Sequence, residues 1–238
     1  AGAHYGRQVA RWLQGLERDT LDVMAHQGEG GTISLAAVPT FATRWLIPRL
    51  PQLAQVHPDI VVHIDTQTRP FLFADTTFDA ALYAGTPEQV ANWPGVQAQL
   101  LMHEDVVPVC SPRLLESAAP RGRGRAHQPV AAEALADLPL LQQSTRPYGW
   151  RQWFDAMGVD APHALDGPRY ELFSMAAVAA THGMGVALMP LLLIEAELAS
   201  GELMVACNRP LRGERAYYLI SPAQAQPPVL TTFAQWLQ

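Results

Sequence analysis

A strand, a tight turn and a helix follow one another over residues 31–50, and this order constrains the fold more than any other feature. The stretch opens with the apolar run Ile33–Val38, turns at Pro39 and Thr40, and continues to Leu50 with apolar residues at helical spacing. A buried strand that leads directly into a helix is typical of α/β domains. The N–H groups of a first helical turn have no partner within the helix, so they can bind a small polar or anionic ligand. The stretch therefore predicts an α/β binding domain.

Strand-like and helix-like segments alternate along the rest of the chain. Strands separated by helices imply a mostly parallel sheet with crossover connections. The predicted strands are Ile33–Val38, Ile60–Thr66, Asp79–Ala84, Val106–Cys110, Pro139–Gln143, Met184–Pro190, Leu203–Cys207 and Tyr217–Ser221. The predicted helices are Thr40–Val56, Pro147–Met157, Leu172–His182, Leu191–Ser200 and Val229–Leu237.

One stretch, residues 111–137, interrupts this alternation with many Pro, Gly, Ala and Arg residues. The interruption indicates two α/β units, joined by one strand near Val106–Cys110 and by a returning strand near Tyr217–Ser221. In such an arrangement we expect a ligand to bind in the cleft between the units, where strand ends and helix starts converge.

The first 27 residues follow a different pattern, with an apolar residue at every third or fourth position. This spacing predicts a helix with one apolar stripe. The run Gly28–Gly31 then ends the helix and forms a flexible joint. We expect the helix to pair with another chain, and docking onto its own domain is the alternative. The stripe consists of Tyr5, Val9, Trp12, Leu16 and Val23, joined by Leu13 and Met24.

Charge and composition exclude several classes of protein. The formal net charge is -6, and the basic run Arg121–Arg125 is interspersed with glycine, as is typical of a solvated loop. A domain that grips DNA through its phosphates is basic, so we do not expect this chain to bind DNA by itself. With 238 residues and 49% hydrophobic content, the chain can build a real core in one large domain or two small ones.

The two cysteines, Cys110 and Cys207, each lie in an apolar strand-like run and show no spacing suited to zinc. They predict buried thiols in a reducing compartment. No secretory signal pattern opens the sequence, and no apolar run approaches the ~20 residues that span a bilayer. We therefore expect a cytoplasmic protein without membrane contact.

The sequence lacks the residue patterns of catalysis. Gly183 and Gly185 have neither the third glycine nor the lysine of a nucleotide-binding loop, and they precede a strand instead of a helix. His103, Glu104 and Asp105 are ionisable neighbours, but adjacent strand residues face opposite sides and cannot all serve one site. The histidines show no metal-ligand spacing. We predict no enzymatic activity, no catalytic residue, no metal and no cofactor.

Several blocks of the sequence are found in the same order in one protein family. The blocks are Val38–Leu50, His57–Ile60, Phe78–Ala81, Trp93–Gly95, Val107–Pro112 and Gly183–Pro190. They resemble the effector-binding domain of LysR-type transcriptional regulators, over nearly the whole chain. The opening residues resemble the family's linker helix; they are Ala1, Gly2 and Tyr5 with Val9, Leu13, Leu16, Glu17 and Thr20. Gln143–Pro147 and Glu171–Met175 are most similar to the branch that includes regulators of glycine cleavage and D-serine use.

The resemblance implies a periplasmic-binding-protein type II-like α/β fold, in which two subdomains are joined by two crossover strands and preceded by a linker helix. It places the linker helix and hinge in residues 1–30, regulatory subdomain 1 in residues 31–108 and 221–238, and regulatory subdomain 2 in residues 109–220. It also implies a winged helix-turn-helix domain before Ala1, absent from this chain, through which alone promoter DNA is contacted. The protomer is then expected in the cytoplasm as a homodimer or homotetramer.

The function implied by the resemblance is the sensing of a small metabolite in the inter-subdomain cleft. An effector controls transcription only if it binds one arrangement of the protein better than another. Available arginines at positions 69 and 146 favour an amino acid or a small carboxylate. Phe41, Tyr83 and Phe173 leave an aromatic ligand open.

The candidate effector-binding residues lie where predicted strands meet helices. Arg69 can pair bidentately with a carboxylate, and Gly85 permits close approach of the backbone to a ligand. Ordinary structural roles are the alternative: Thr40 as a helix cap, Arg69 as a solvated loop residue and Phe173 as a core residue. The candidates are Pro39, Thr40, Phe41, Gln67, Thr68, Arg69, Tyr83, Gly85, Ser144, Thr145, Phe173 and Ser174.

Two other functions are compatible with the implied fold, because fold does not determine function. The first is a solute-binding protein that feeds a transporter, against which the missing signal pattern and the leading helix both argue. The second is an oligomerisation module whose cleft binds no ligand. Ligand binding by the isolated chain separates the sensor from the oligomerisation module.

Overall fold

The computed structural model describes residues 31–118, 128–224 and 227–238, together with Gly6, Val9, Leu13 and Thr20. Those four residues are helical, and Leu13 is exposed. The rest of the predicted linker helix, the joint from Gly28 to Gly30 and the run Arg121–Arg125 lie outside the described residues. The chain forms two compact units: unit 1 contains the described residues up to His103 and those of Glu214–Gln238, and unit 2 contains those of Glu104–Gly213.

The sheet of unit 1 contains three parallel strands, which are extended by β9 (Leu211–Pro222) and by the first part of β4 (Val96–Cys110). The parallel strands β1 (Gly31–Ala37), β2 (Ile60–Thr66) and β3 (Ala80–Gly85) pair in the order β2-β1-β3, as the alternation in the sequence predicted. Strand β9 pairs antiparallel with β3, and Leu82 lies opposite Leu219. Because β1, β2 and β3 are parallel, their carboxyl ends lie at one edge of the sheet.

The helical run after β1 is continuous but irregular. It consists of α2 (Pro39–Phe41), the π-helical turn η1 (Ala42–Leu46), the 3-10 turn η2 (Ile47–Arg49) and α3 (Leu50–Val56). The prediction of one helix over Thr40–Val56 was thus right in extent and wrong in regularity. Pro48 and Pro51 have no N–H to donate, so the ordinary hydrogen-bond ladder cannot run through this segment.

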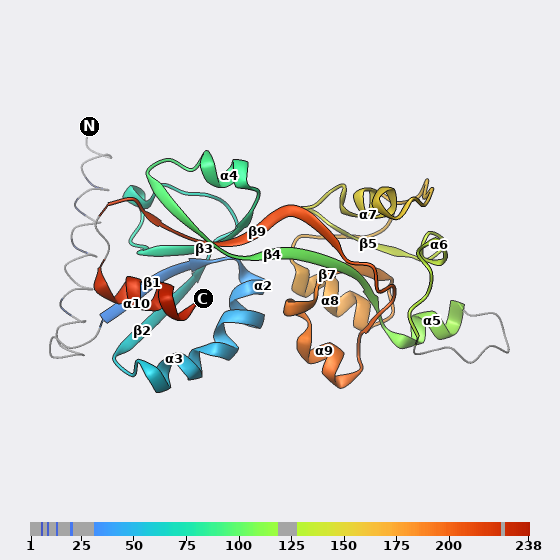
Figure 1. Ribbon diagram of the computed structural model, residues 1–238, viewed down its shortest axis with the longest axis horizontal. Coiled ribbons are helices and arrows are strands. Elements are labelled where there is room, and N and C mark those ends of the chain that lie inside the picture. Colours follow the sequence, from blue (N-terminus) through green and yellow to red (C-terminus); the bar gives the residue numbers. More distant parts are fainter. Residues whose placement is uncertain are drawn as a thin grey trace. The chain divides into compact units, whose positions relative to one another are not determined.

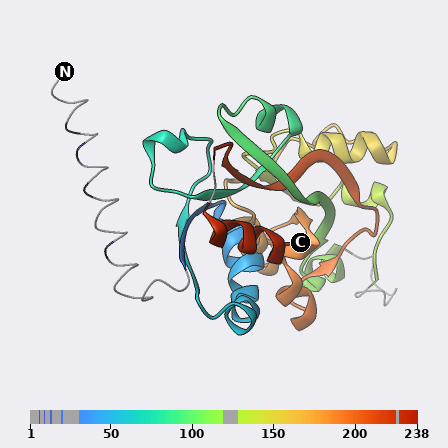
Figure 2. The same cartoon turned by 60° about the vertical axis from the view of Figure 1, so that its left-hand side comes forward.

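Two further helices and one short turn complete unit 1. In Figure 1, α4 (Pro87–Ala91) lies above the strands and the run from α2 to α3 lies below them. Figure 2 shows α10 (Pro228–Trp236), in dark red, beside the start of β1, where Val229 fills the space next to Gly31. The 3-10 turn η3 (Phe73–Asp75) carries part of an aromatic cluster with Tyr83 and Trp93.

The strands of unit 2 run in mixed directions. Strands β5 (Leu140–Gln143), β6 (Arg169–Tyr170) and β7 (Val186–Pro190) are parallel, in the order β7-β5-β6. Strand β4 (Val96–Cys110) pairs antiparallel with β7, and the short β8 (Met204–Val205) pairs with β4.

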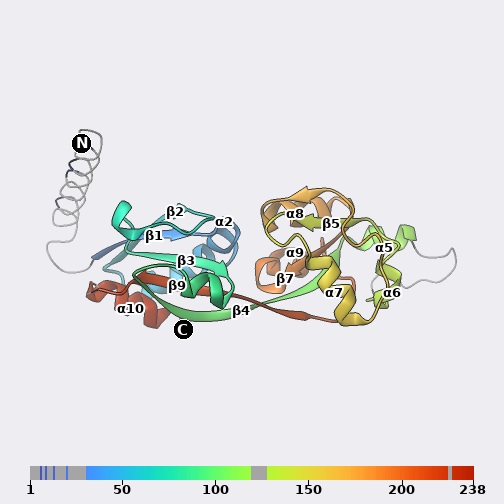
Figure 3. The same ribbon diagram turned by 90° about the horizontal axis from the view of Figure 1, so that it is seen from above.

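The helices of unit 2 cover both faces of its sheet. Helices α7 (Gly149–Met157) and α8 (Phe173–Thr181) lie on opposite sides of β5 and β7 (Figures 1 and 3). Trp150 and Trp153 of α7 are buried, and their indole N–H groups donate to the carbonyls of Leu141 and Arg209. The remaining elements are α5 (Pro112–Ala118), α6 (Ala132–Leu135), η4 (Leu191–Leu193) and α9 (Glu195–Ser200).

The observed elements differ from the expected ones in two respects: two strands are longer, and three short helices were not expected. Strands β4 and β9 are much longer than the predicted Val106–Cys110 and Tyr217–Ser221. Their additional residues mix apolar with polar side chains and are mostly exposed or half-buried, so the sequence showed no clear apolar run there. Short helices were missed at α4, α5 and α6, since a helix of four to seven residues shows little periodicity. The two compact units divide at His103 and Gly213, and the subdomain bounds after residues 108 and 220 stay a prediction.

None of the helices in the described part of the chain has the length and apolarity needed to span a membrane.

Candidate functional site

Two stretches of unit 1 follow the carboxyl ends of the neighbouring parallel strands β1 and β2. Pro39 and Thr40 come after β1, and their neighbour Val38 donates its backbone N–H to the carbonyl of Leu82 on β3 at 3.1 Å. Gln67, after β2, donates its N–H to the carbonyl of Ala37 on β1 at 2.9 Å. These bonds hold the ends of the three strands together, which is where open α/β sheets bind ligands.

Thr40 and Phe41, at the start of the helical run, are buried and not part of a solvated loop. Thr40 is buried in the first turn, and Pro39 precedes it at the first helical position. Phe41 is also buried, and its ring stacks between Trp45 at 4.6 Å and Tyr217 at 4.4 Å. The structure therefore places the Phe41 ring in the core of unit 1, and Thr40 lies beside that core.

The segment Gln67–Arg69 is exposed along its whole length. The Arg69 side chain makes no ion pair or hydrogen bond with the rest of the described residues. A guanidinium in this state is available for an anion that approaches from solvent.

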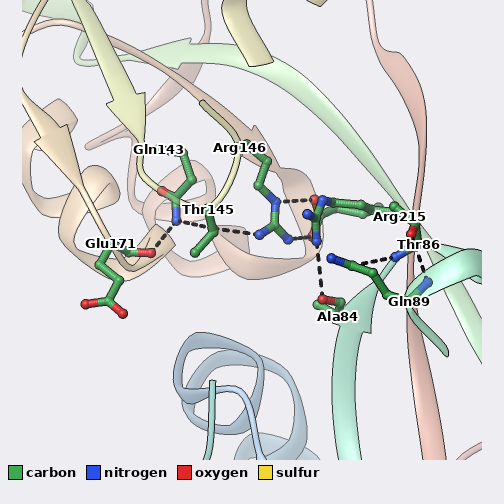
Figure 4. A network of polar contacts seen from close by, with 9 residues as sticks. Ala84, Thr86, Gln89, Gln143, Thr145, Arg146, Glu171 and Arg215 are labelled. Atoms are coloured by element: carbon green, nitrogen blue, oxygen red, sulfur yellow. Dashed lines mark hydrogen bonds and ion pairs between the residues drawn. The ribbon is translucent and has the colours of Figure 1, made fainter. Parts of the chain in front are cut away.

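The ring of Tyr83 packs over the end of β3, the strand on which Tyr83 lies. Tyr83 is buried and meets Trp93 edge to face at 5.3 Å. A Cβ at Gly85 would lie 2.3 Å from Cε1 of Tyr83, so the Tyr83 ring occupies the space that only a glycine leaves open here. Thr86 and Gln89 then form a capping box at the start of α4 (Figure 4).

In unit 2 the predicted residues follow the ends of the parallel neighbours β5 and β6. Ser144 and Thr145 are exposed, and the Ser144 N–H donates to the carbonyl of Tyr170 at 2.7 Å. Phe173 and Ser174 open α8, where Phe173 is buried and Ser174 is half-buried. The fold thus brings the two predicted pairs to one edge of the unit 2 sheet.

An ion pair lies next to these residues. Arg146 donates from Nε and Nη2 to the two carboxylate oxygens of Glu104, at 2.9 and 2.6 Å, and from Nη1 to Oγ1 of Thr145 at 2.7 Å (Figure 4). The guanidinium carbon lies 5.2 Å from the centre of the Phe173 ring. Arg146 is therefore committed to an internal carboxylate and is not the available cation that the sequence suggested.

A small cavity adjoins the ion pair within unit 2. It has a volume of about 40 Å³, which is room for one or two small groups. Its wall is mostly apolar, with Gln143 and Arg146 as the polar residues and Trp150, Phe173 and Leu188 among the apolar ones. A separate, open apolar groove runs along α8 past Ser174, Met175 and Val178.

Consecutive carboxylates on β4 take different partners, as the alternation of strand residues predicted. Glu104 is buried against Arg146, whereas Asp105 accepts two hydrogen bonds from the exposed Arg212 at 2.8 and 2.7 Å. Hydrogen bonding to Asp105 raises the pKa of Arg212. The two carboxylates therefore do not converge on one catalytic centre.

Sequence reasoning missed three residues at these places. The alternation of strand residues separated Glu104 from its neighbours but did not show which side of the strand is buried, so its burial against Arg146 was not evident. Gln143 was predicted as the last residue of a strand, and only its place before Ser144 and Thr145 could have marked it as part of the site. Tyr217 was predicted to lie on a crossing strand, but its stacking on Phe41 depends on a pairing between distant segments.

Comparison with known proteins gives a consistent result. Residues 26–238 match the family model described as LysR substrate binding domain. The glycine cleavage system transcriptional activator of Escherichia coli (strain K12) is 29% identical over 237 residues, which cover 99% of this chain and 73% of that protein. The HTH-type transcriptional regulator PerR of the same strain is 31% identical over 242 residues, covering 98% of this chain and 72% of that protein.

Solved structures show the same fold. The effector domain of the transcriptional regulator AmpR of Pseudomonas aeruginosa superposes with a TM-score of 0.72 at 25% identity, covering 87% of this chain and 94% of that domain. Full-length AphB of Vibrio cholerae, a virulence activator, gives a TM-score of 0.65 at 18% identity, covering 99% of this chain and 78% of that protein. At this identity the second likeness concerns the fold alone.

Proposed function

This chain belongs to the LysR substrate-binding-domain family, and from this premise we propose that it senses an amino acid or a small carboxylate for a transcriptional regulator. It is the effector-binding domain of a LysR-type regulator, and its relatives are transcriptional regulators and activators. The class of effector and the residues that bind it are our proposal. We propose no catalytic role for the chain.

The observation that carries the proposal is the gathering of polar residues at the carboxyl ends of parallel strands in each unit. In unit 1, β1 and β2 lead into Thr40 and into the exposed segment Gln67–Arg69. In unit 2, β5 and β6 lead into Ser144, Thr145 and Ser174. Such strand ends bind ligands in open α/β sheets, and hydroxyls with an arginine suit a small carboxylate.

The assignment of contacts follows from exposure and charge. Arg69 supplies the cation, because Arg146 is already paired with Glu104. Pro39, Thr40, Gln67 and Thr68 are proposed to surround the same end of the effector. Thr145, Phe173 and Ser174 are proposed to contact the effector from unit 2 together with Ser144. Phe41, Tyr83 and Gly85 are proposed to support the site: Phe41 lies in the same helical turn as Thr40, and Tyr83 and Gly85 lie at the end of β3.

The full-length regulator is proposed to work as a homodimer or homotetramer in the cytoplasm and to reach promoter DNA through an N-terminal helix-turn-helix domain. Oligomerisation and promoter binding are properties of the family, and the number of protomers is our proposal. An exposed apolar strip on α8, formed by Met175, Val178 and nearby Met184, supports self-association.

The test is a thermal-shift screen of the chain against amino acids, small carboxylates and simple aromatics. A ligand that binds only the folded state raises the melting temperature by mass action. We expect a shift with one class of carboxylate, and we expect Arg69→Ala to weaken its binding by about 10- to 100-fold without lowering the melting temperature of the unliganded protein.

Arg151→Ala is the matched control, because Arg151 is exposed on α7 and away from the proposed contacts. Thr40→Val and Ser144→Ala test one contact in each unit. A screen in which no compound shifts the melting temperature contradicts the proposed function. Unchanged affinity in Arg69→Ala removes that residue from the site.

A further inference from the structure

Gln143, the last residue of β5, holds its side-chain amide in one orientation. Its Nε2 donates to the backbone carbonyl of Glu171 and, at 3.3 Å, to Oγ1 of Thr145 (Figure 4). Only the nitrogen of an amide can donate to a carbonyl oxygen, so chemistry decides which end of the amide faces Glu171. The amide oxygen Oε1 therefore points away from both partners.

That oxygen has no hydrogen-bond donor among the described residues, although it is buried. Buried polar atoms in folded proteins almost always have a partner, since an unpaired one carries a desolvation penalty. Gln143 also lines the small cavity described above, where the other polar residue is Arg146. The cavity has room for a small polar group of a ligand, such as an amino or hydroxyl group.

The charge next to Gln143 is balanced. The Arg146 guanidinium is matched by both oxygens of Glu104, and a third hydrogen bond joins it to Thr145. A carboxylate that approached this part of unit 2 would meet a neutralised cation, the Glu104 carboxylate and the acceptor Oε1 of Gln143. A hydrogen-bond donor would meet an unpaired acceptor instead.

We propose that Oε1 of Gln143 is a specificity-determining acceptor, which takes a hydrogen bond from an amino or hydroxyl group of the effector. Unit 2 then recognises the end of the ligand that carries a hydrogen-bond donor. A ligand with a second carboxylate at that end would bind less tightly. The inference rests on the proposed function, because it assumes that an effector binds, and it narrows that effector to an acid that carries a donor group.

The first experiment uses matched ligands with the unaltered chain. Each set contains a 2-amino acid, the corresponding 2-hydroxy acid and the unsubstituted acid, such as glycine, glycolate and acetate, or alanine, lactate and propionate. We expect the amino acid or the hydroxy acid to bind about 10- to 100-fold more tightly than the unsubstituted acid of its set. Comparison of the amino acid with the hydroxy acid shows which of the two donor groups the protein prefers.

The second experiment replaces the acceptor. Gln143→Met keeps the length of the side chain and removes the oxygen, so we expect the preference within each set to disappear. Gln152→Met is the matched control, because Gln152 is exposed on α7, and we expect it to keep the full preference.

The outcomes separate this inference from the function on which it rests. Equal binding of all members of a set by the unaltered chain overturns the inference alone. A preference that survives in Gln143→Met also overturns it. If no acid of any set binds, the proposed function fails and the inference fails with it. The ligand comparison needs no variant, so it tests the inference even if Gln143→Met does not fold.

Discussion

Cys110 lies fully buried at the end of β4, and burial raises the pKa of its thiol to about 12. The cause is desolvation, which disfavours the charged thiolate. Cys207 is also buried, and desolvation is the main cause of its raised pKa. Both thiols therefore stay protonated at neutral pH and are poor nucleophiles in the folded protein.

The raised pKa of Cys110 predicts a loss of stability in alkaline solution. In the unfolded chain this thiol titrates near its ordinary value of 9.0, while in the folded chain it keeps its proton up to about 12. Its contribution to the free energy of unfolding is thus fully present below pH 9 and is lost as the pH rises from 9 towards 12. The limiting slope is about 1.4 kcal/mol per pH unit.

Urea unfolding of the wild type and of Cys110→Ala between pH 8 and pH 10.5 measures this slope. We expect the stability of the wild type to fall more steeply above pH 9 than that of the variant, because all other titrating groups are shared. Parallel curves would show that Cys110 ionises in the folded protein as easily as in the unfolded one.

Two ion pairs join β4 to other segments. In both, an arginine donates from Nε and Nη2 to the two oxygens of a carboxylate, but the two pairs differ in how deeply they are buried. The Glu104 and Arg146 side chains are 3% and 18% exposed, and they tie β4 to the turn before α7. The Asp105 and Arg212 side chains are 39% and 65% exposed, and they tie β4 to β9. Removal of one member of a buried pair leaves an uncompensated charge out of water, whereas a solvated pair contributes little.

This contrast predicts unequal effects of two conservative substitutions. We expect Glu104→Gln to lower the free energy of unfolding by about 2–4 kcal/mol, because Arg146 then lacks its counter-charge. Asp105→Asn is the matched control on the neighbouring residue, and we expect a far smaller change that added salt removes. Urea unfolding at low and high salt measures both, and similar losses in the two variants would refute the role of burial.

At the scale of the whole molecule, the exposed apolar strip on α8 bears on assembly. Val178 is 54% exposed between Met175 and Met184, and these residues line one open groove. We expect the chain to associate with itself through this strip, and Val178→Asp to raise the dissociation constant at least about tenfold, since a charge would then be desolvated in the contact. Sedimentation velocity over a range of concentrations measures the change.

Gln152→Asp introduces the same charge on the exposed side of α7 and serves as the control for this prediction. We expect its sedimentation to match that of the wild type. If Val178→Asp sediments like the wild type as well, the strip on α8 is not a contact between protomers.

Local features of the sequence determined the strands, the main helices and the family. Apolar runs such as Ile60–Thr66 form strands, and apolar residues at helical spacing, as in Phe173–Thr181, form helices. These signals are local because the periods of strand and helix are set by the backbone. The sequence also marked the stretches after β1, β2, β5 and β6, since polar residues there follow buried strands directly.

The partners of individual side chains were decided only by the tertiary structure. Glu104 meets Arg146 across 42 residues of sequence, and Asp105 meets Arg212 across 107. Such pairs depend on which strands are neighbours and in which register, and no local period carries that information. For the same reason the sequence could name Arg146 as a cation but could not show that Glu104 neutralises it. Phe41 likewise entered the core because the returning strand β9 places Tyr217 against it.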